Sequence, residues 1–215
     1  MKDTVIFDMD GVICHTNPTH SVAFKVFFEK RGMYPTEAEF GQHMYGKSNS
    51  YIFSHFFGRP VSGEELLAYE DEKEGLFREL YADQIVPIDG FMPWLEYLDE
   101  SGLKLGVATS APRANMDLIL AGLGIVDVFG SKMGSEDVDV HKPAPQVYLR
   151  SAERLGAAVS SCLVFEDSHA GVTAGLAAGM DVVGVLSSHT ADELPQCKAY
   201  IDAYKVADLA SLLTA

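Results

Sequence analysis

The sequence is poor in several features that would place it in particular classes of protein. Its three cysteines, Cys14, Cys162 and Cys197, are widely separated and form no C-x-x-C pair. This spacing predicts neither a disulfide framework nor a zinc site, so we expect free thiols. Basic residues are also few, with 16 Lys and Arg against 31 Asp and Glu and a formal net charge of -15. Because non-specific binding of nucleic acid needs clustered basic residues, we expect no nucleic-acid partner.

Long apolar runs are missing as well. The opening MKDTVIFDMDG has an apolar run that Asp8 breaks after a few residues, and no stretch of the chain approaches the length of a membrane span. We therefore expect a cytoplasmic protein without a membrane partner, and a monomer. Apolar residues nevertheless make up 47% of the sequence, which is enough for a full core.

Short apolar runs recur along most of the chain. Four of them, at residues 4–8, 103–109, 162–167 and 181–186, are typical of buried strands. Helical patterns that end at glycine lie between the later runs. Strands that are apolar throughout and alternate with helices predict a parallel sheet covered on both faces. The sequence therefore predicts a doubly wound, Rossmann-like α/β core formed by residues 1–13 and 87–215.

Residues 14–86 interrupt this alternation. They contain no strand-like run, and helical patterns occur at 18–31, 36–44, 48–57 and 63–82. We predict an all-helical domain inserted directly after the first strand. Because ligands of open α/β sheets bind outside the carboxyl ends of the strands, this domain is expected to act as a cap over the site.

Polar residues gather where the predicted strands end. They are Asp8 and Asp10 after the first run, Thr109 and Ser110 after the second, Glu166 and Asp167 in the third, and Lys142 before a later helix. The carboxyl ends of parallel strands meet at one edge of the sheet, so four carboxylates and one ammonium would converge there. Carboxylates crowded in this way repel one another unless a divalent cation neutralises them. Oxygen ligands favour Mg²⁺ as that cation.

Two aspartates separated by one residue can divide the work of phosphoryl transfer. Side chains alternate along a strand, so Asp8 and Asp10 can face one pocket where the chain leaves the sheet. One carboxylate can attack phosphorus and form an aspartyl phosphate, while the other protonates the leaving oxygen. We expect Asp8 to be the nucleophile and Asp10 the general acid and base. Lys142 and the Thr109 hydroxyl would stabilise the charge on the phosphoryl oxygens.

Four segments, FDMDGV, VATS, HKPAP and FEDSHAG, together resemble the four motifs of the haloacid dehalogenase superfamily. Within it the chain looks most like the branch of β-phosphoglucomutase and phosphoglycolate phosphatase, whose members insert a helical cap after the first strand. The resemblance implies Mg²⁺ held by the Asp8 carboxylate, the Asp10 carbonyl and Asp167. It also implies that Glu166 assists in holding the metal.

The predicted cap contains candidate substrate contacts. His20 and Lys73 resemble cap residues of β-phosphoglucomutase; Lys73 lies on the apolar stripe of its helix, which is compatible with an inward contact or with a lysine that reaches back to solvent. The G-x-S-R segment that grips a second phosphate in that enzyme reads Gly-Lys-Ser-Asn here. Asn49 therefore replaces the arginine, and Lys47 could substitute only as a point charge.

The second motif offers further candidates. Ser110 and Thr109 can cap a helix that begins near Pro112, and the same geometry can hold a phosphate. Arg113, which follows directly, is a further candidate phosphate contact.

Three functions are compatible with these residues. The first is a Mg²⁺-dependent phosphatase acting on a small phosphorylated metabolite, such as a sugar phosphate, through an aspartyl phosphate. The second is a phosphosugar mutase similar to β-phosphoglucomutase, which the missing arginine disfavours. The third is a catalytically inactive binding protein, which is disfavoured because no motif residue is missing.

Overall fold

The computed structural model describes residues 1–44 and 48–214 and divides them into two compact units. One unit comprises Met1–His15 and Ile85–Ala215, and the other comprises Thr16–Gln84. The two segments that connect the units pair with each other at their base. His15 N donates to Val86 O at 3.2 Å, and Ile88 N donates to Ile13 O at 2.9 Å.

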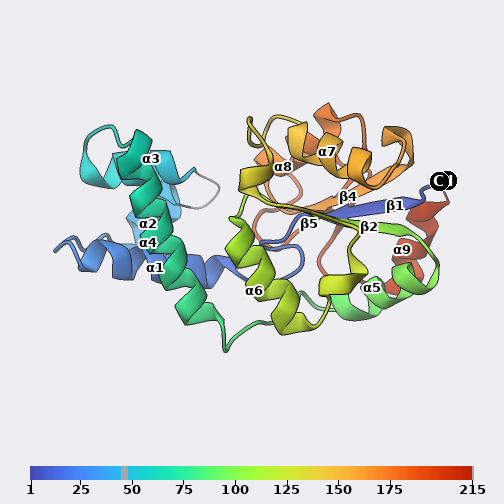
Figure 1. Ribbon diagram of the computed structural model, residues 1–215, viewed down its shortest axis with the longest axis horizontal. Helices are drawn as coiled ribbons and strands as arrows, with labels where there is room; N and C mark the ends of the chain where they lie inside the picture. The colour runs from blue at the N-terminus through green and yellow to red at the C-terminus, as the bar shows by residue number, and fades with distance from the viewer. Residues whose placement is uncertain (45–47, 215) are drawn as a thin grey trace. The chain divides into compact units, whose positions relative to one another are not determined.

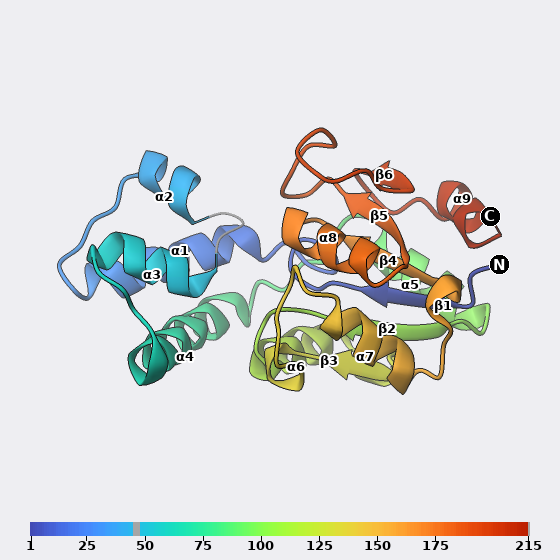
Figure 2. The same ribbon diagram turned by 90° about the horizontal axis from the view of Figure 1, so that it is seen from above.

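The first unit contains a six-stranded sheet in the order β3-β2-β1-β4-β5-β6, in which all neighbours are parallel (Figure 2). The strands are β1 (Thr4–Phe7), β2 (Lys104–Ala108), β3 (Ser131–Met133), β4 (Cys162–Glu166), β5 (Asp181–Val185) and β6 (Ala199–Ile201). The strand order reverses beside β1, because β2 and β3 lie on one side of it and β4 to β6 on the other. A reversal of this kind marks the usual ligand crevice of an open α/β sheet.

Helices cover both faces of the sheet, which confirms the predicted doubly wound fold (Figure 1). Helices α7 (Gln146–Arg154) and α8 (His169–Ala177) lie on one face; α5 (Phe91–Glu100), α6 (Arg113–Leu123) and α9 (Val206–Leu209) lie on the other. Single 3-10 turns are η1 (Val126–Val128), η2 (Ser135–Asp137), η3 (Val159–Ser161) and η4 (Ala210–Leu213).

The centre of the core surrounds the strand that leads to Asp8. All four residues of β1 are buried, and the Phe7 ring stacks on Phe165 at 5.1 Å and meets the edge of Phe91 at 5.3 Å. Buried aromatic pairs of this kind contribute about 0.5–1.5 kcal/mol beyond their area. Asp8 N then donates to Phe165 O at 3.0 Å, so the sheet fixes the backbone of the predicted nucleophile.

The second unit is helical and contains α1 (Asn17–Glu29), α2 (Glu37–His43), α3 (Asn49–Phe57) and α4 (Gly63–Tyr81). Its core is rich in buried phenylalanine, and ring contacts join Phe24, Phe27, Phe28 and Phe53 into one cluster. These are the four helical segments predicted from the sequence.

Two other expectations can be compared with the described residues. All three cysteines are free thiols, as expected. Across residues 1–44 and 48–214, no helix combines the length and the apolar character needed to cross a membrane.

Candidate active site

Two of the predicted catalytic residues, Asp8 and Lys142, meet at the carboxyl edge of the sheet. Lys142 extends its ammonium from the segment before α7, where Nζ donates to Asp8 Oδ1 at 2.6 Å and to Glu166 Oε1 at 2.7 Å. A third bond, to Ala108 O at 3.0 Å, ties it to the end of β2. The Lys142 side chain is 5% exposed and that of Asp8 is 8% exposed, so the ion pair is largely shielded from water.

Three buried carboxylates lie close enough together to share a cation. Asp8, Glu166 and Asp167 each offer one oxygen, and these atoms all lie within 4.8 Å of one another. Burial raises the pKa of Asp8 well above its ordinary value, and the charges of Glu166 and Asp167 raise it further against the opposing effect of Lys142. Burial, with the Glu166 charge, likewise raises the pKa of Asp167 to about 8.

This electrostatic imbalance fits a divalent cation. Burial alone would lower the pKa of Lys142, but the Asp8 and Glu166 charges outweigh it and raise that pKa. One ammonium nevertheless faces several carboxylates. A hard cation with oxygen ligands would remove the remaining repulsion, and the donor set is of the type that Mg²⁺ prefers.

The turn after β1 approaches the same carboxylates. Gly11 has a φ of 73°, and a Cβ atom there would lie 2.1 Å from Asp167 Oδ2. The glycine is therefore required both by the backbone conformation and by the close approach. The Asp10 charge contributes to the raised pKa of Asp8, which places this aspartate beside the nucleophile.

The predicted site residues that follow β2 make contacts outside the cluster of carboxylates. Thr109 is buried, and its Oγ1 accepts a hydrogen bond from Ala111 N at 3.0 Å, while Ser110 is exposed at the end of β2. Arg113 begins α6, and its guanidinium forms an ion pair with Asp137.

The cap candidates lie in the helical unit. Lys73 is buried: its Nζ donates to Glu74 Oε1 at 2.7 Å and lies 2.8 Å from His20 Nδ1. Asn49 is the first residue of α3, and Lys47 lies outside the described residues. Lys73 therefore points inward rather than to solvent, and its contact with a substrate stays a prediction.

Sequence reasoning did not identify several polar residues that contact the site. Ser188 Oγ donates to Asp167 Oδ2, and His189 Nδ1 lies 3.0 Å from Asp167 O. Tyr148 OH donates to Glu166 Oε1 at 3.1 Å. Ser188 and His189 follow β5, so their place at a predicted strand end is the signal that could have revealed them.

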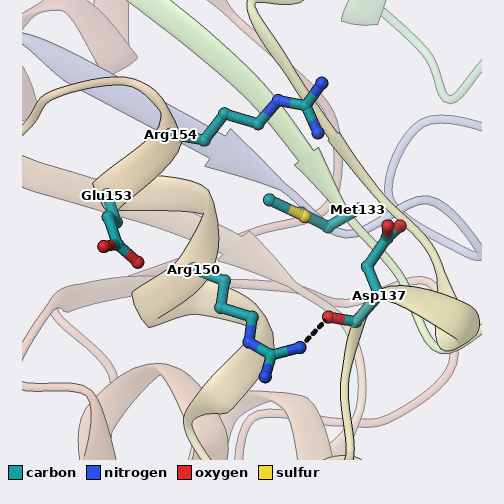
Figure 3. A pocket seen from close by; sticks show the side chains of 5 residues that line it. All are labelled: Met133, Asp137, Arg150, Glu153 and Arg154. Carbon is teal, nitrogen blue, oxygen red and sulfur yellow. Dashed lines mark hydrogen bonds between the residues drawn. The ribbon is translucent and has the colours of Figure 1, made fainter.

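A hollow of about 290 Å³ lies elsewhere on the core, beside α7. Figure 3 shows its lining residues, which are Met133, Asp137, Arg150, Glu153 and Arg154. Two basic and two acidic side chains balance in charge, and Arg150 is held by the Asp137 carbonyl and by Asp139. The predicted catalytic residues are not in this lining, so the candidate site remains the edge near Asp8.

Comparison with known proteins identifies the family of the chain. Residues 5–185 match the pattern of the family described as haloacid dehalogenase-like hydrolase. Fructose-1-phosphate phosphatase YqaB of Escherichia coli is 31% identical over 185 residues, which cover 84% of this chain and 95% of that protein.

Solved structures show the same fold. A family IA, variant 3 hydrolase from Entamoeba histolytica superposes with a TM-score of 0.90 at 26% identity, covering 100% of both chains. β-Phosphoglucomutase from Clostridium difficile superposes with a TM-score of 0.82 at 25% identity, covering 100% of this chain and 98% of that one.

The family match and the phosphatase relatives show an enzyme of the phosphatase or phosphotransferase type. The chain belongs to the haloacid dehalogenase-like hydrolase family. The resemblance seen in the sequence motifs is thereby confirmed.

Proposed function

We propose that the protein is a Mg²⁺-dependent phosphatase that hydrolyses a small phosphomonoester through a phosphorylated Asp8. The observation that carries this proposal is the ion pair between Lys142 Nζ and Asp8 Oδ1, at 2.6 Å, in the same cluster as Asp167. Lys142 orients one carboxylate oxygen of Asp8, which leaves the other oxygen to act as the nucleophile.

The first step transfers the phosphoryl group to Asp8. One Asp8 oxygen attacks phosphorus as the bond from phosphorus to the leaving oxygen breaks, and Asp10 donates its proton to that oxygen. The Thr109 hydroxyl accepts a bond from Ala111 N, so its own hydrogen can be donated to a phosphoryl oxygen. Lys142 balances part of the charge that gathers on the transferred group.

The second step returns the site to its starting state. Asp10, now a carboxylate, takes a proton from a water molecule that attacks phosphorus, and the bond between phosphorus and Asp8 breaks. Inorganic phosphate leaves and Asp8 is regenerated. Each aspartate thus ends the cycle in the protonation state in which it began.

Mg²⁺ would be held by Asp8 and Asp167, with the Asp10 carbonyl, and when bound it would neutralise charge on the carboxylates and the phosphoryl oxygens. The raised pKa values of Asp8 and Asp167 support this assignment, because burial first, and the neighbouring carboxylates after it, disfavour their charged forms, and a bound cation would offset both effects.

Sugar phosphates are the substrate class that we propose. YqaB, a fructose-1-phosphate phosphatase, is similar to this chain over most of its length. We also propose that the helical unit acts as the cap that selects the substrate. It is inserted between β1 and α5, and the strand that leads into it ends at the nucleophile.

A phosphosugar mutase is the second candidate, favoured by the structural likeness to β-phosphoglucomutase. A mutase must hold a bisphosphate by its distal phosphate while the intermediate turns round, and must keep water from the aspartyl phosphate meanwhile. Asn49 lacks the guanidinium of an arginine, and a charged hydrogen bond lost in this way is worth about 1.5–3 kcal/mol.

We expect phosphate release to match the disappearance of a sugar monophosphate, with isomerised sugar phosphate as a minor product. The measurement compares phosphate released with sugar phosphate consumed across a panel of phosphorylated sugars. If β-glucose 1-phosphate instead became glucose 6-phosphate with little phosphate released, and a catalytic amount of the bisphosphate accelerated this conversion, the mutase function would replace the phosphatase.

Asp167→Asn is expected to weaken the binding of Mg²⁺ rather than the chemistry. The concentration of Mg²⁺ that gives half-maximal activity should rise at least ~10-fold, and excess Mg²⁺ should recover part of the lost activity. A titration of activity with MgCl₂ measures this shift, and Asp127→Asn, an exposed aspartate on η1, serves as the control. An unchanged half-saturation, or activity that excess Mg²⁺ does not restore, would show that Asp167 has another role.

A further inference from the structure

We propose that Tyr148 is a positioning residue that acts through Glu166 to hold the Lys142 ammonium on Asp8. This inference rests on the proposed function, because it assigns a role within the same phosphoryl transfer. Tyr148 lies on α7, is fully buried, and is joined to the site through its hydroxyl.

The contacts of Lys142 explain why its position needs control. Its ammonium is shared between two carboxylates, at 2.6 Å from Asp8 Oδ1 and 2.7 Å from Glu166 Oε1. Any change that strengthens the attraction of Glu166 would draw the lysine away from the nucleophile. The ammonium also lies 4.8 Å from the centre of the Tyr148 ring, so the ring borders the space in which it can move.

Tyr148 competes with Lys142 for one oxygen of Glu166. The phenol donates to Glu166 Oε1 at 3.1 Å, the same atom that accepts from Lys142. A second donor uses part of the hydrogen-bonding capacity of that oxygen, and so weakens its attraction for the Lys142 ammonium. Without the hydroxyl, Lys142 would be the remaining donor to Oε1.

The other oxygen of Glu166 is also occupied. Oε2 accepts from Ser168 N at 2.9 Å and from Ser168 Oγ at 3.0 Å. A Cβ atom at Gly171 would lie 1.5 Å from Oε1, so α8 passes directly against the carboxylate. Glu166 therefore has little freedom to turn, and its position fixes where the lysine sits.

Four donors match the lone-pair capacity of a carboxylate. Glu166 is thus used fully by Lys142, Tyr148 and Ser168. Although one of its oxygens lies near those of Asp8 and Asp167, its proposed role is to orient the lysine, and direct binding of the metal is left to the two aspartates. This distinguishes it from Asp167, whose contacts come from Ser187 and Ser188. The effect of Tyr148 should consequently appear in turnover and not in the requirement for Mg²⁺.

The test is Tyr148→Phe, which removes only the hydroxyl and keeps the buried ring. We expect kcat for phosphate release to fall about 10-fold, the scale of one lost hydrogen bond to a charged group. KM and the half-saturating concentration of Mg²⁺ should change less than about 2-fold, since neither the substrate contacts nor the metal ligands are altered.

The matched control is Ser151→Ala on the same helix. Ser151 Oγ donates to Ser131 Oγ at 3.0 Å in the core, so this variant also loses one buried hydrogen bond of α7 but leaves Glu166 and Lys142 untouched. We expect kcat of Ser151→Ala to match that of the wild type. An equal fall in both variants would mean that Tyr148 acts only through the stability of the helix, and would overturn the proposal.

A double-mutant cycle separates a role through Lys142 from an independent one. In a Lys142→Ala background, Tyr148→Phe should lower kcat no further, because the group that Tyr148 positions is gone. Additive losses would overturn the proposal. If the wild type released no phosphate at all, the proposed function would fail; if the wild type were active and Tyr148→Phe kept full kcat, the positioning role alone would fail.

Discussion

Asp8→Asn is expected to lower kcat for phosphate release at least ~10³-fold while the fold stays intact. An amide has nearly the shape of the carboxylate but is a very poor nucleophile, so the covalent step is lost. The fold should survive because Asp8 is one of several buried carboxylates that repel one another, and removing its charge relieves part of that repulsion. Phosphate release and a thermal unfolding curve measure the two effects.

Labelling makes the Asp8 experiment specific. Wild-type protein quenched during turnover with ³²P-labelled substrate should carry label on the protein, and Asp8→Asn should carry none. Asp127→Asn is the matched control for the same chemical change on the surface, and it should be labelled like the wild type. Labelling or near-normal turnover in Asp8→Asn would show that another residue receives the phosphoryl group.

Asp10→Asn is expected to lower kcat for an alkyl phosphate by at least ~10³-fold, because an asparagine cannot transfer the proton that both steps need. With an aryl phosphate as the substrate, the experiment should show which of the two steps Asp10→Asn can still carry out. The phenolate of p-nitrophenyl phosphate leaves without being protonated, so the first step can proceed, whereas water attack still lacks its base. Rapid mixing should therefore show a burst of about one equivalent of p-nitrophenol followed by slow release.

The absence of this burst distinguishes other roles for Asp10. A linear, slow time course with p-nitrophenyl phosphate would mean that Asp10 is already needed for attack by Asp8, for example by holding the turn at Gly11. Steady turnover near the wild-type rate would remove Asp10 from the mechanism altogether.

The central strands of the core could be predicted because each is an uninterrupted apolar run. β1 and β4 are buried along their whole length, which makes the hydrophobic pattern continuous. β3 and β6 were not predicted. Each has only three residues at an edge of the sheet, which is too short to stand out as the apolar run of a buried strand, and β3 also contains Ser131 and Lys132.

The part of the candidate site that lies at the ends of the central strands could also be predicted. Asp8 and Asp167 follow the ends of neighbouring strands, and a topological rule brings such residues together. Tyr148 could not be recognised, because its role depends on the rotation of α7 about its axis. The phosphate contact of Arg113 stays a prediction; its ion pair with Asp137 of η2 could not be recognised, because the two residues are far apart in the sequence.

The paired segments at the base of the helical unit have a consequence for how such a protein can change. The backbone hydrogen bonds of His15 and Ile88 hold the two connecting segments side by side. The two points at which the chain leaves and re-enters the α/β unit therefore stay adjacent, whatever sequence lies between them. The entropy of closing a loop grows only slowly with its length, by about 0.6 kcal/mol for each doubling. Helices of a different number or sequence could therefore occupy this position without shifting the register of β1. The substrate specificity of such a protein could then change during evolution while the residues at the end of β1 keep their positions.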